Sequence, residues 1–131
     1  MSLRLEAATT LGDFSLDVAL TTSSTLALAG PSGAGKSTVL RIVAGLHRPE
    51  RGRVVCGDAT WLDTERGIDV EPERRRCGYV FQDYALFPHL RAWQNVAYGL
   101  RDVPRSERRE RALALLDRFG VRGRADARPA S

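Results

Sequence analysis

Lysine is nearly absent from this sequence, because Lys36 is the only lysine among 20 lysine and arginine residues. Long apolar runs are absent too, and no stretch approaches the roughly 20 residues that span a bilayer. The beginning, Met1 to Glu6, carries neither a long apolar segment nor a small-residue cleavage site. These absences argue against a membrane-spanning or exported chain. We expect a cytoplasmic protein whose membrane contact comes through a partner.

Cysteine is scarce as well, with only Cys56 and Cys77. They lack CxxC spacing and a nearby histidine cluster, which argues against a disulfide framework and a zinc site. We expect both to be reduced and partly buried. The net charge of +4 is modest, and the basic residues are mixed with acidic ones, so we expect no nucleic-acid partner. The runs Arg74–Arg76 and Arg105–Arg111 are interpreted as solvated faces.

The single lysine lies in a run that fits the phosphate-loop pattern G-x-x-x-x-G-K-[ST]. The apolar run Thr25–Ala29 before it predicts a buried strand. Helical spacing after it predicts a helix over 36–46, ended by Gly45 and Pro49. Strand, glycine loop and helix in this order are the context that the motif requires. The predicted ATP site consists of Gly30, Pro31, Ser32, Gly33, Ala34, Gly35, Lys36, Ser37 and Thr38.

The residue types in this loop match phosphate chemistry. Glycines allow backbone amides to approach the phosphates, and the positive end of the following helix favours an anion. Lys36 would place a compact charge at the β- and γ-phosphates and is predicted to be catalytic. Ser37 would supply a hydroxyl to Mg²⁺.

A second informative stretch begins with the β-prone run Tyr79–Phe81 and ends in a helix from about Arg91. Gln82, at the end of the predicted strand, would face the metal and the γ-phosphate, either orienting a water or binding Mg²⁺ weakly. An ordinary junction between a strand and a loop is the alternative interpretation of Gln82 taken alone.

The segment Arg76–Leu90 closely resembles the Q-loop of ABC transporter ATPases of the importer type. Further stretches carry the same resemblance, which covers essentially the whole chain: Leu40–Leu46, Pro49–Val54 and Trp93–Val96. The connection Trp61–Arg76 looks most like that of molybdate importer ATPases.

This resemblance implies an ATP-binding subunit that couples ATP binding and hydrolysis to uptake of a solute, such as molybdate or another oxyanion. Gln82 would be a catalytic and Mg²⁺-binding residue that links nucleotide state to transport. Tyr84–Leu90 would contact the transmembrane permease subunits. A second ATPase subunit would close the site by its signature loop, at the inner face of the cell membrane.

One departure from the family concerns adenine. The aromatic residue that stacks on the base would fall at Leu11, before Gly12. Phe14 is the nearest aromatic, but the alternation of Phe14, Leu16, Val18 and Leu20 favours a strand with Phe14 in the core. The residue that stacks on adenine stays open.

The family's signature loop, Walker B strand and switch histidine have no counterpart in the sequence. Leu113–Asp117 resembles a Walker B strand, but Ala112, Leu115, Leu116 and Phe119 recur at helical spacing and favour a helix ending at Gly120. His47 and His89 are expected on the surface. Ala125–Ser131 resembles the linker before the signature loop, so we expect a truncated chain that does not hydrolyse ATP alone.

The predicted fold is α/β: a partial P-loop NTPase core with an antiparallel β subdomain and the start of a helical subdomain. Residues 1–90 would form the strand-rich core, with strands within 1–30 and 51–81. Residues 91–131 would begin the helical part, with 105–119 as its clearest helix. Three alternatives remain: a nucleotide-binding fragment without turnover, a soluble P-loop kinase, and an ABC-type ATPase acting on DNA.

Overall fold

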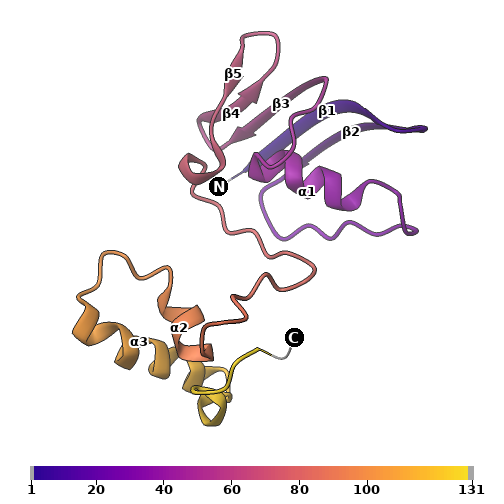
Figure 1. The fold of residues 1–131 in the computed structure, drawn as a ribbon. Coiled ribbons are helices and arrows are strands. Elements are labelled where there is room, and N and C mark those ends of the chain that lie inside the picture. The colour runs from indigo at the N-terminus through magenta and orange to yellow at the C-terminus, as the bar shows by residue number, and fades with distance from the viewer. Residues whose placement is uncertain (1, 130–131) are drawn as a thin grey trace. The chain divides into compact units, whose positions relative to one another are not determined.

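The computed structural model describes residues 2–129, which form two compact units that divide between Tyr79 and Val80 (Figure 1). Met1, Ala130 and Ser131, which fall within the predicted domain and linker, lie outside the described residues.

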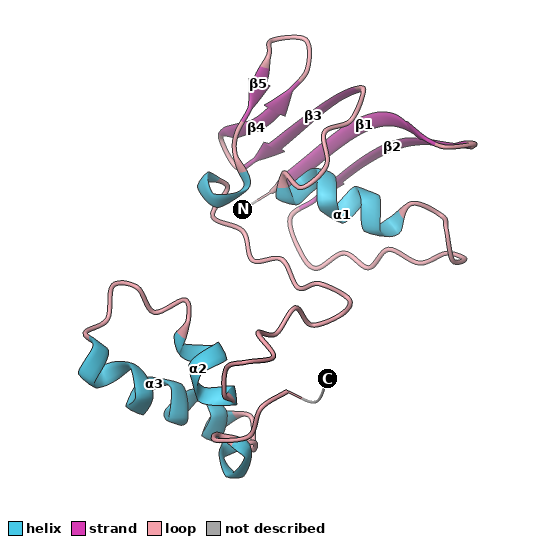
Figure 2. Ribbon diagram, in the orientation of Figure 1, coloured by secondary structure: helices cyan, strands magenta, loops and turns pink. Residues whose placement is uncertain are grey.

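The first unit contains an antiparallel sheet of five strands with the order β2-β1-β3-β4-β5 (Figure 2). Its strands are β1 (Leu3–Leu11), β2 (Phe14–Thr22), β3 (Arg51–Cys56), β4 (Ala59–Asp63) and β5 (Ile68–Asp69). The β1–β2 hairpin keeps its register up to the pair Leu11 and Phe14, so Gly12 and Asp13 form its turn. The α/β class with an antiparallel sheet is therefore confirmed.

The helix α1 (Lys36–Ala44) packs on this sheet and completes the hydrophobic core. The strands β1 and β2 alternate apolar and polar residues, so each has one apolar side that can face the helix. Val39 and Ile42 of α1 meet this face, and Ile42 is 0% exposed. The buried sheet residues in the same cluster are Leu5, Ala7, Leu16, Val54 and Leu62.

The end of α1 comes two residues earlier than the predicted boundary. Gly45 has a left-handed φ of 80°, and its amide donates to Ile42 O at 3.1 Å. The amide of Leu46 donates to Arg41 O at 2.8 Å. These two bonds satisfy carbonyls that the last helical turn leaves free, as in a glycine-terminated helix.

Two predicted strands are wrong. Thr25–Ala29 and Tyr79–Phe81 have no strand assignment, and none of the described strands pairs with them. Leu26 is 49% exposed and Val80 is 86% exposed, so neither run is buried as a whole. A strand forms only where a neighbouring strand pairs with it, and neither run is among the strands of the described sheet.

The second unit consists mainly of α2 (Ala92–Ala97) and α3 (Arg105–Arg118), followed by a 3₁₀ turn at Arg122–Arg124. The predicted helix 105–119 is confirmed to within one residue. Since Leu113–Asp117 lies inside α3, the helical interpretation of this run is correct. No helix among the described residues has the length and apolar character needed to cross a membrane.

The apolar face of α3 is only partly used. Ala112 and Leu116 are buried, whereas Leu115 and Phe119 are exposed. The predicted solvated face is confirmed for most of Arg105–Arg111, but Arg108 is half-buried and donates to Val103 O at 2.8 Å.

The backbone of α2 is joined to the segment after α3. Ala92 N donates to Ala127 O at 2.8 Å and Trp93 N donates to Ala125 O at 3.0 Å. Both amides belong to the first turn of α2, where the backbone N–H groups have no acceptor within the helix itself. The segment after α3 supplies the acceptors instead.

The predictions for cysteine and histidine have mixed outcomes. Cys56 and Cys77 are free and half-buried, as predicted. His89 is exposed, which also confirms the prediction. The prediction that His47 lies on the surface is wrong. Its side chain is half-buried, and its Nε2 atom is buried without a hydrogen-bond partner in the described chain.

Candidate nucleotide site

The phosphate loop is exposed and leads directly into α1. Gly35 is the N-cap residue of the helix, with a left-handed φ of 81°. A Cβ at this position would lie 3.0 Å from Leu16 Cδ1 and 3.2 Å from Phe14 Cε1, because both side chains of β2 pack under the loop. The glycine is therefore needed both for its backbone angle and for the space it leaves.

Phe14 does not lie in the core, in contrast to the favoured interpretation. It is 40% exposed, whereas Leu16 on the same strand is buried. The first residue of β2 is at the end of the sheet, so its ring reaches the loop instead of the core. Phe14 thus gives the loop an aromatic neighbour.

The Lys36 side chain folds back over the loop. Its Nζ donates to Gly30 O at 2.8 Å and to Pro31 O at 2.6 Å. The ammonium therefore lies against the carbonyls at the start of the loop, with its positive charge close to the N-terminus of α1.

The first turn of α1 contains no acidic residue. Within the described residues it has no acidic side chain and no side-chain cap. Ser37, the second residue of the helix, is exposed. Uncapped amides and the positive end of the helix dipole favour an anion at this place. Together with Lys36, this arrangement is suited to a phosphate chain.

Gln82 belongs to the second unit and lies in an exposed turn, not at the end of a strand. The turn is tight: Tyr84 N donates to Phe81 O at 3.2 Å, and Tyr84 and Ala85 both have left-handed φ values, of 59° and 47°. Left-handed backbone is costly for residues with a Cβ, so this turn holds local strain.

Candidate metal ligands remain those that the sequence predicts. Residues 2–129 contain no group of three or more histidine, cysteine, aspartate or glutamate side chains that could hold a metal ion. The hydroxyl of Ser37 and the amide oxygen of Gln82 are oxygen donors of the kind that Mg²⁺ accepts.

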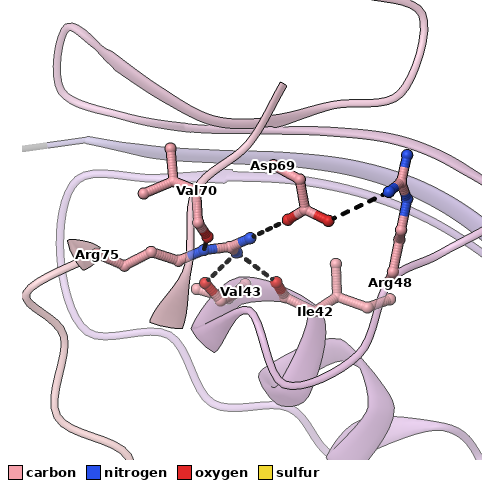
Figure 3. A network of polar contacts seen from close by, with 6 residues as sticks. All are labelled: Ile42, Val43, Arg48, Asp69, Val70 and Arg75. Atoms are coloured by element: carbon pink, nitrogen blue, oxygen red, sulfur yellow. Dashed lines mark hydrogen bonds and ion pairs between the residues drawn. The ribbon is translucent and has the colours of Figure 1, made fainter. Parts of the chain in front are cut away.

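Arg75 is the residue at which the sequence-based interpretation is most clearly wrong. The pattern of Arg74–Arg76 predicts a solvated run, but Arg75 is 2% exposed. Its Nη1 donates to Ile42 O at 2.8 Å and Val43 O at 2.9 Å, the carbonyls at the end of α1 (Figure 3).

The other donors of Arg75 bind the chain around β5. Nε donates to Val70 O at 2.8 Å and Nη2 donates to Asp69 Oδ1 at 3.1 Å. Asp69 also lies 3.6 Å from Arg48 (Figure 3). Burial lowers the pKa of the Arg75 guanidinium from its ordinary value, and the Asp69 carboxylate opposes this shift. Nothing in the residue types of three consecutive arginines distinguishes the buried one.

The predicted partner segment Tyr84–Leu90 carries exposed apolar side chains, including Tyr84, Leu86 and Phe87. Asn95 of α2 forms hydrogen bonds with the backbone of the second half of this segment. Asn95 Oδ1 accepts a bond from Phe87 N at 2.8 Å, and its Nδ2 lies 3.2 Å from both Phe87 O and Leu90 O. No local pattern in the sequence indicates this role for Asn95.

A mostly apolar hollow of about 500 Å³ opens beside this segment within the second unit. Its lining comes from the partner segment, α2, α3 and the C-terminal stretch, and comprises Leu86, Ala92, Asn95, Val96, Leu116, Arg124, Ala127, Arg128 and Pro129. Such a surface can receive apolar side chains of another molecule.

Comparison with known proteins points to one family. The family model for ABC transporters matches residues 14–131. The molybdenum import ATP-binding protein ModC of Rhodospirillum rubrum is 49% identical over 79% of this chain. The molybdate/tungstate import ATP-binding protein WtpC of Archaeoglobus fulgidus is 41% identical over 99% of it. The ATP-binding cassette MJ0796, solved as a dimer in a post-hydrolysis state bound to ADP and Pi, has a TM-score of 0.68 and 27% identity.

The chain is short relative to these proteins. It spans 28% of the length of the Rhodospirillum rubrum protein and 52% of the Archaeoglobus fulgidus protein. The match to the solved cassette covers 97% of this chain but only 61% of the cassette. The matched region includes both the phosphate loop and the segment around Gln82.

Proposed function

Because this chain belongs to the ABC transporter family, we propose that it binds ATP through the loop Gly30–Thr38, as part of an importer's ATP-binding subunit. The observation that carries the proposal is the N-terminus of α1, where Gly35, Lys36 and Ser37 meet with no acidic residue in the described first turn. A phosphate chain finds amide donors, a helix dipole and an ammonium there.

The roles of the loop residues follow from their chemistry. Loop amides and the Lys36 ammonium would bind the phosphates, and Ser37 would supply one oxygen to Mg²⁺. The metal would neutralise charge on the phosphates when bound. Gln82 is proposed as the second oxygen donor and as a reporter of the γ-phosphate. Its exposure in a strained turn supports this role, since such a turn can change its conformation at modest cost.

The whole protein's task is proposed from its relatives. Proteins named as molybdenum or molybdate/tungstate import ATP-binding proteins are 40–49% identical to this chain. We propose that the complete subunit couples ATP hydrolysis to uptake of molybdate or a similar oxyanion, at the inner face of the cell membrane. The dimeric state of the solved cassette supports a second ATPase subunit as partner.

Permease subunits are proposed to bind at Tyr84–Leu90. The exposed aromatic and aliphatic side chains of this segment and the apolar hollow beside it support a protein partner. The segment's attachment through Asn95 would keep it ready for docking.

Calorimetric titration of the 131-residue chain with Mg–ATP tests the proposed site. We expect micromolar binding by the native chain and at least a tenfold loss in Lys36→Ala, because the substitution removes the charge that faces the phosphates. Lys36→Arg is also expected to weaken binding, because a planar guanidinium does not replace a compact ammonium.

Arg41→Ala is the matched control, since it removes a positive charge from the exposed side of the last turn of the same helix. Its affinity should stay within twofold of native. Equal affinities for Lys36→Ala and the native chain would refute the site, as would no binding by a native chain shown to be folded by circular dichroism.

A further inference from the structure

We propose that Arg75 is a positioning residue for nucleotide binding, which holds the phosphate loop in place by clamping the opposite end of α1. This inference rests on the proposed function, because the loop must bind a phosphate chain for its position to matter. It assigns a role to a side chain that touches neither the loop nor any predicted ligand.

The clamp consists of four hydrogen bonds from one buried guanidinium. Two go to the helix, from Nη1 to Ile42 O and Val43 O, and two go to the chain around β5, through Val70 O and Asp69 Oδ1. A planar guanidinium with fixed donor directions restricts both partners more than a single flexible donor would. The end of α1 is thereby joined to the sheet side of the unit by directional polar bonds in addition to packing.

Displacement at one end of α1 reaches the other because the helix is short. Its nine residues span about 13 Å at roughly 1.5 Å per residue. Lys36 and Ser37 are its first two residues, and Ile42 and Val43 fall in its last turn. A helix of this length moves as one body, so the anchorage at Ile42 and Val43 helps to set the height and tilt of the loop amides.

The charge of Arg75 stabilises α1 in addition to its hydrogen bonds. A cation at the C-terminus of a helix interacts favourably with the negative end of the dipole, and an anion does so at the N-terminus. Arg75 at one end and a bound phosphate at the other would thus both stabilise α1. Asp69 keeps the guanidinium oriented and is itself paired with Arg48 (Figure 3).

The chain continues from Arg75 toward the other predicted site residue. Arg76 follows in a left-handed conformation, with φ of 50°, and the chain then runs to Gln82. Arg75 thus precedes the segment that bears Gln82 in the sequence.

Arg75→Gln and its neighbour Arg74→Gln form a matched pair for the test. Both remove one arginine from the same run, but the Arg74 side chain is 77% exposed and pairs only with Glu71 in the described structure, at 3.6 Å. In calorimetric titration with Mg–ATP, we expect about tenfold weaker binding for Arg75→Gln and a change of less than twofold for Arg74→Gln.

A rescue experiment separates positioning from general loss of structure. In Arg75→Ala, low millimolar guanidinium should recover part of the lost affinity, because it can occupy the space of the missing group and bind the same carbonyls. Methylammonium at equal concentration should recover less. Loss of affinity that no guanidinium restores would mean that Arg75 serves stability alone and would overturn the proposal.

The amide resonances of Gly33, Gly35 and Lys36 provide a readout without nucleotide. We expect them to shift in Arg75→Gln and to stay in place in Arg74→Gln, and unmoved resonances in both would overturn the inference. If Arg75→Gln does not fold, Arg75→Lys keeps the charge and should show the same shifts at smaller size. A native chain that binds no Mg–ATP would refute the proposed function, whereas unshifted loop resonances would refute the clamp independently.

Discussion

The guanidinium of Arg75 lies over Gly45, so close that a Cβ on Gly45 would come within 2.7 Å of Nε. The two residues are 30 positions apart in the sequence, and the glycine end of one helix leaves the space that the arginine fills. Gly45 thus serves two purposes: its left-handed φ of 80° ends α1, and its missing side chain admits the clamp.

Gly45→Ala should therefore cost more than the strain of its backbone angle. A left-handed alanine costs about 1 kcal/mol, and the added methyl must also displace the buried guanidinium. We expect a total loss of about 2–4 kcal/mol in the free energy of unfolding, since disruption of a buried hydrogen-bonded charge is costly. Urea unfolding followed by circular dichroism measures it.

Gly57→Ala is the control for that experiment. Gly57 has a similar left-handed φ of 57°, but a Cβ there would meet nothing within 4 Å. Its loss should be limited to about 1 kcal/mol of backbone strain. Equal losses of unfolding free energy in the two variants would show that the Arg75 side chain can move away from the added methyl group without destabilising the protein.

The contact between α1 and the sheet is expected to dominate the stability of the first unit. Ile42 is 0% exposed and Leu40, on the other side of the same helix, is 52% exposed. Ile42→Ala should destabilise by about 2–5 kcal/mol, because it leaves a cavity in the core. Leu40→Ala should change the unfolding free energy by less than about 0.5 kcal/mol. Similar midpoints of thermal unfolding for the two variants would contradict this packing.

Asn95 is predicted to order the second half of the partner segment. Asn95→Asp preserves the acceptor for Phe87 N but removes the donors to the carbonyls of Phe87 and Leu90. Hydrogen exchange should therefore stay slow at Phe87 in Asn95→Asp and become faster in Asn95→Ala. Proteolysis within 84–90 should increase in both. A segment equally resistant in native and Asn95→Ala chains would show that it is held by other contacts.

Packing, not ion pairs, is expected to hold the second unit together. Asp126 faces Arg91 at 3.0 Å and Arg109 at 3.7 Å, but all three side chains are more than half exposed. Asp126→Asn should cost less than about 1 kcal/mol, as exposed pairs usually do, and raised salt should reduce this further. Leu116→Ala, in the buried face of α3, should cost about 2–3 kcal/mol. Urea unfolding at low and high salt compares them.

Local patterns predicted the elements that carry their own signals. The alternation in β2, the glycine loop before α1 and the spacing in α3 each specify a backbone path within a few residues. The placement of Lys36 at the beginning of a helix followed from the motif alone. Family resemblance, based on the same loop and the segment Arg76–Leu90, is confirmed by the comparisons.

Long-range partners explain the errors. Thr25–Ala29 and Tyr79–Phe81 have strand-like composition, but a strand forms only where a neighbour supplies hydrogen bonds, and single runs do not encode that neighbour. The burial of Arg75 depends on carbonyls more than 30 positions earlier in the chain. The error at Phe14 has a simpler reason. Alternation predicts which side of a strand a residue faces, but it does not predict whether the core extends as far as the end of the strand.

The two hydrogen bonds from Lys36 to the loop carbonyls have a calorimetric consequence. A nucleotide that recruits this ammonium must first break both bonds, so binding is an exchange of partners and not a simple gain. The measured enthalpy would be the difference between the bonds made to the phosphates and the bonds broken at the carbonyls, both of which are strengthened by the charge of the ammonium. A small binding enthalpy would then be compatible with a tightly held phosphate. Removal of the ammonium would change the enthalpy of binding less than it changes the free energy of binding.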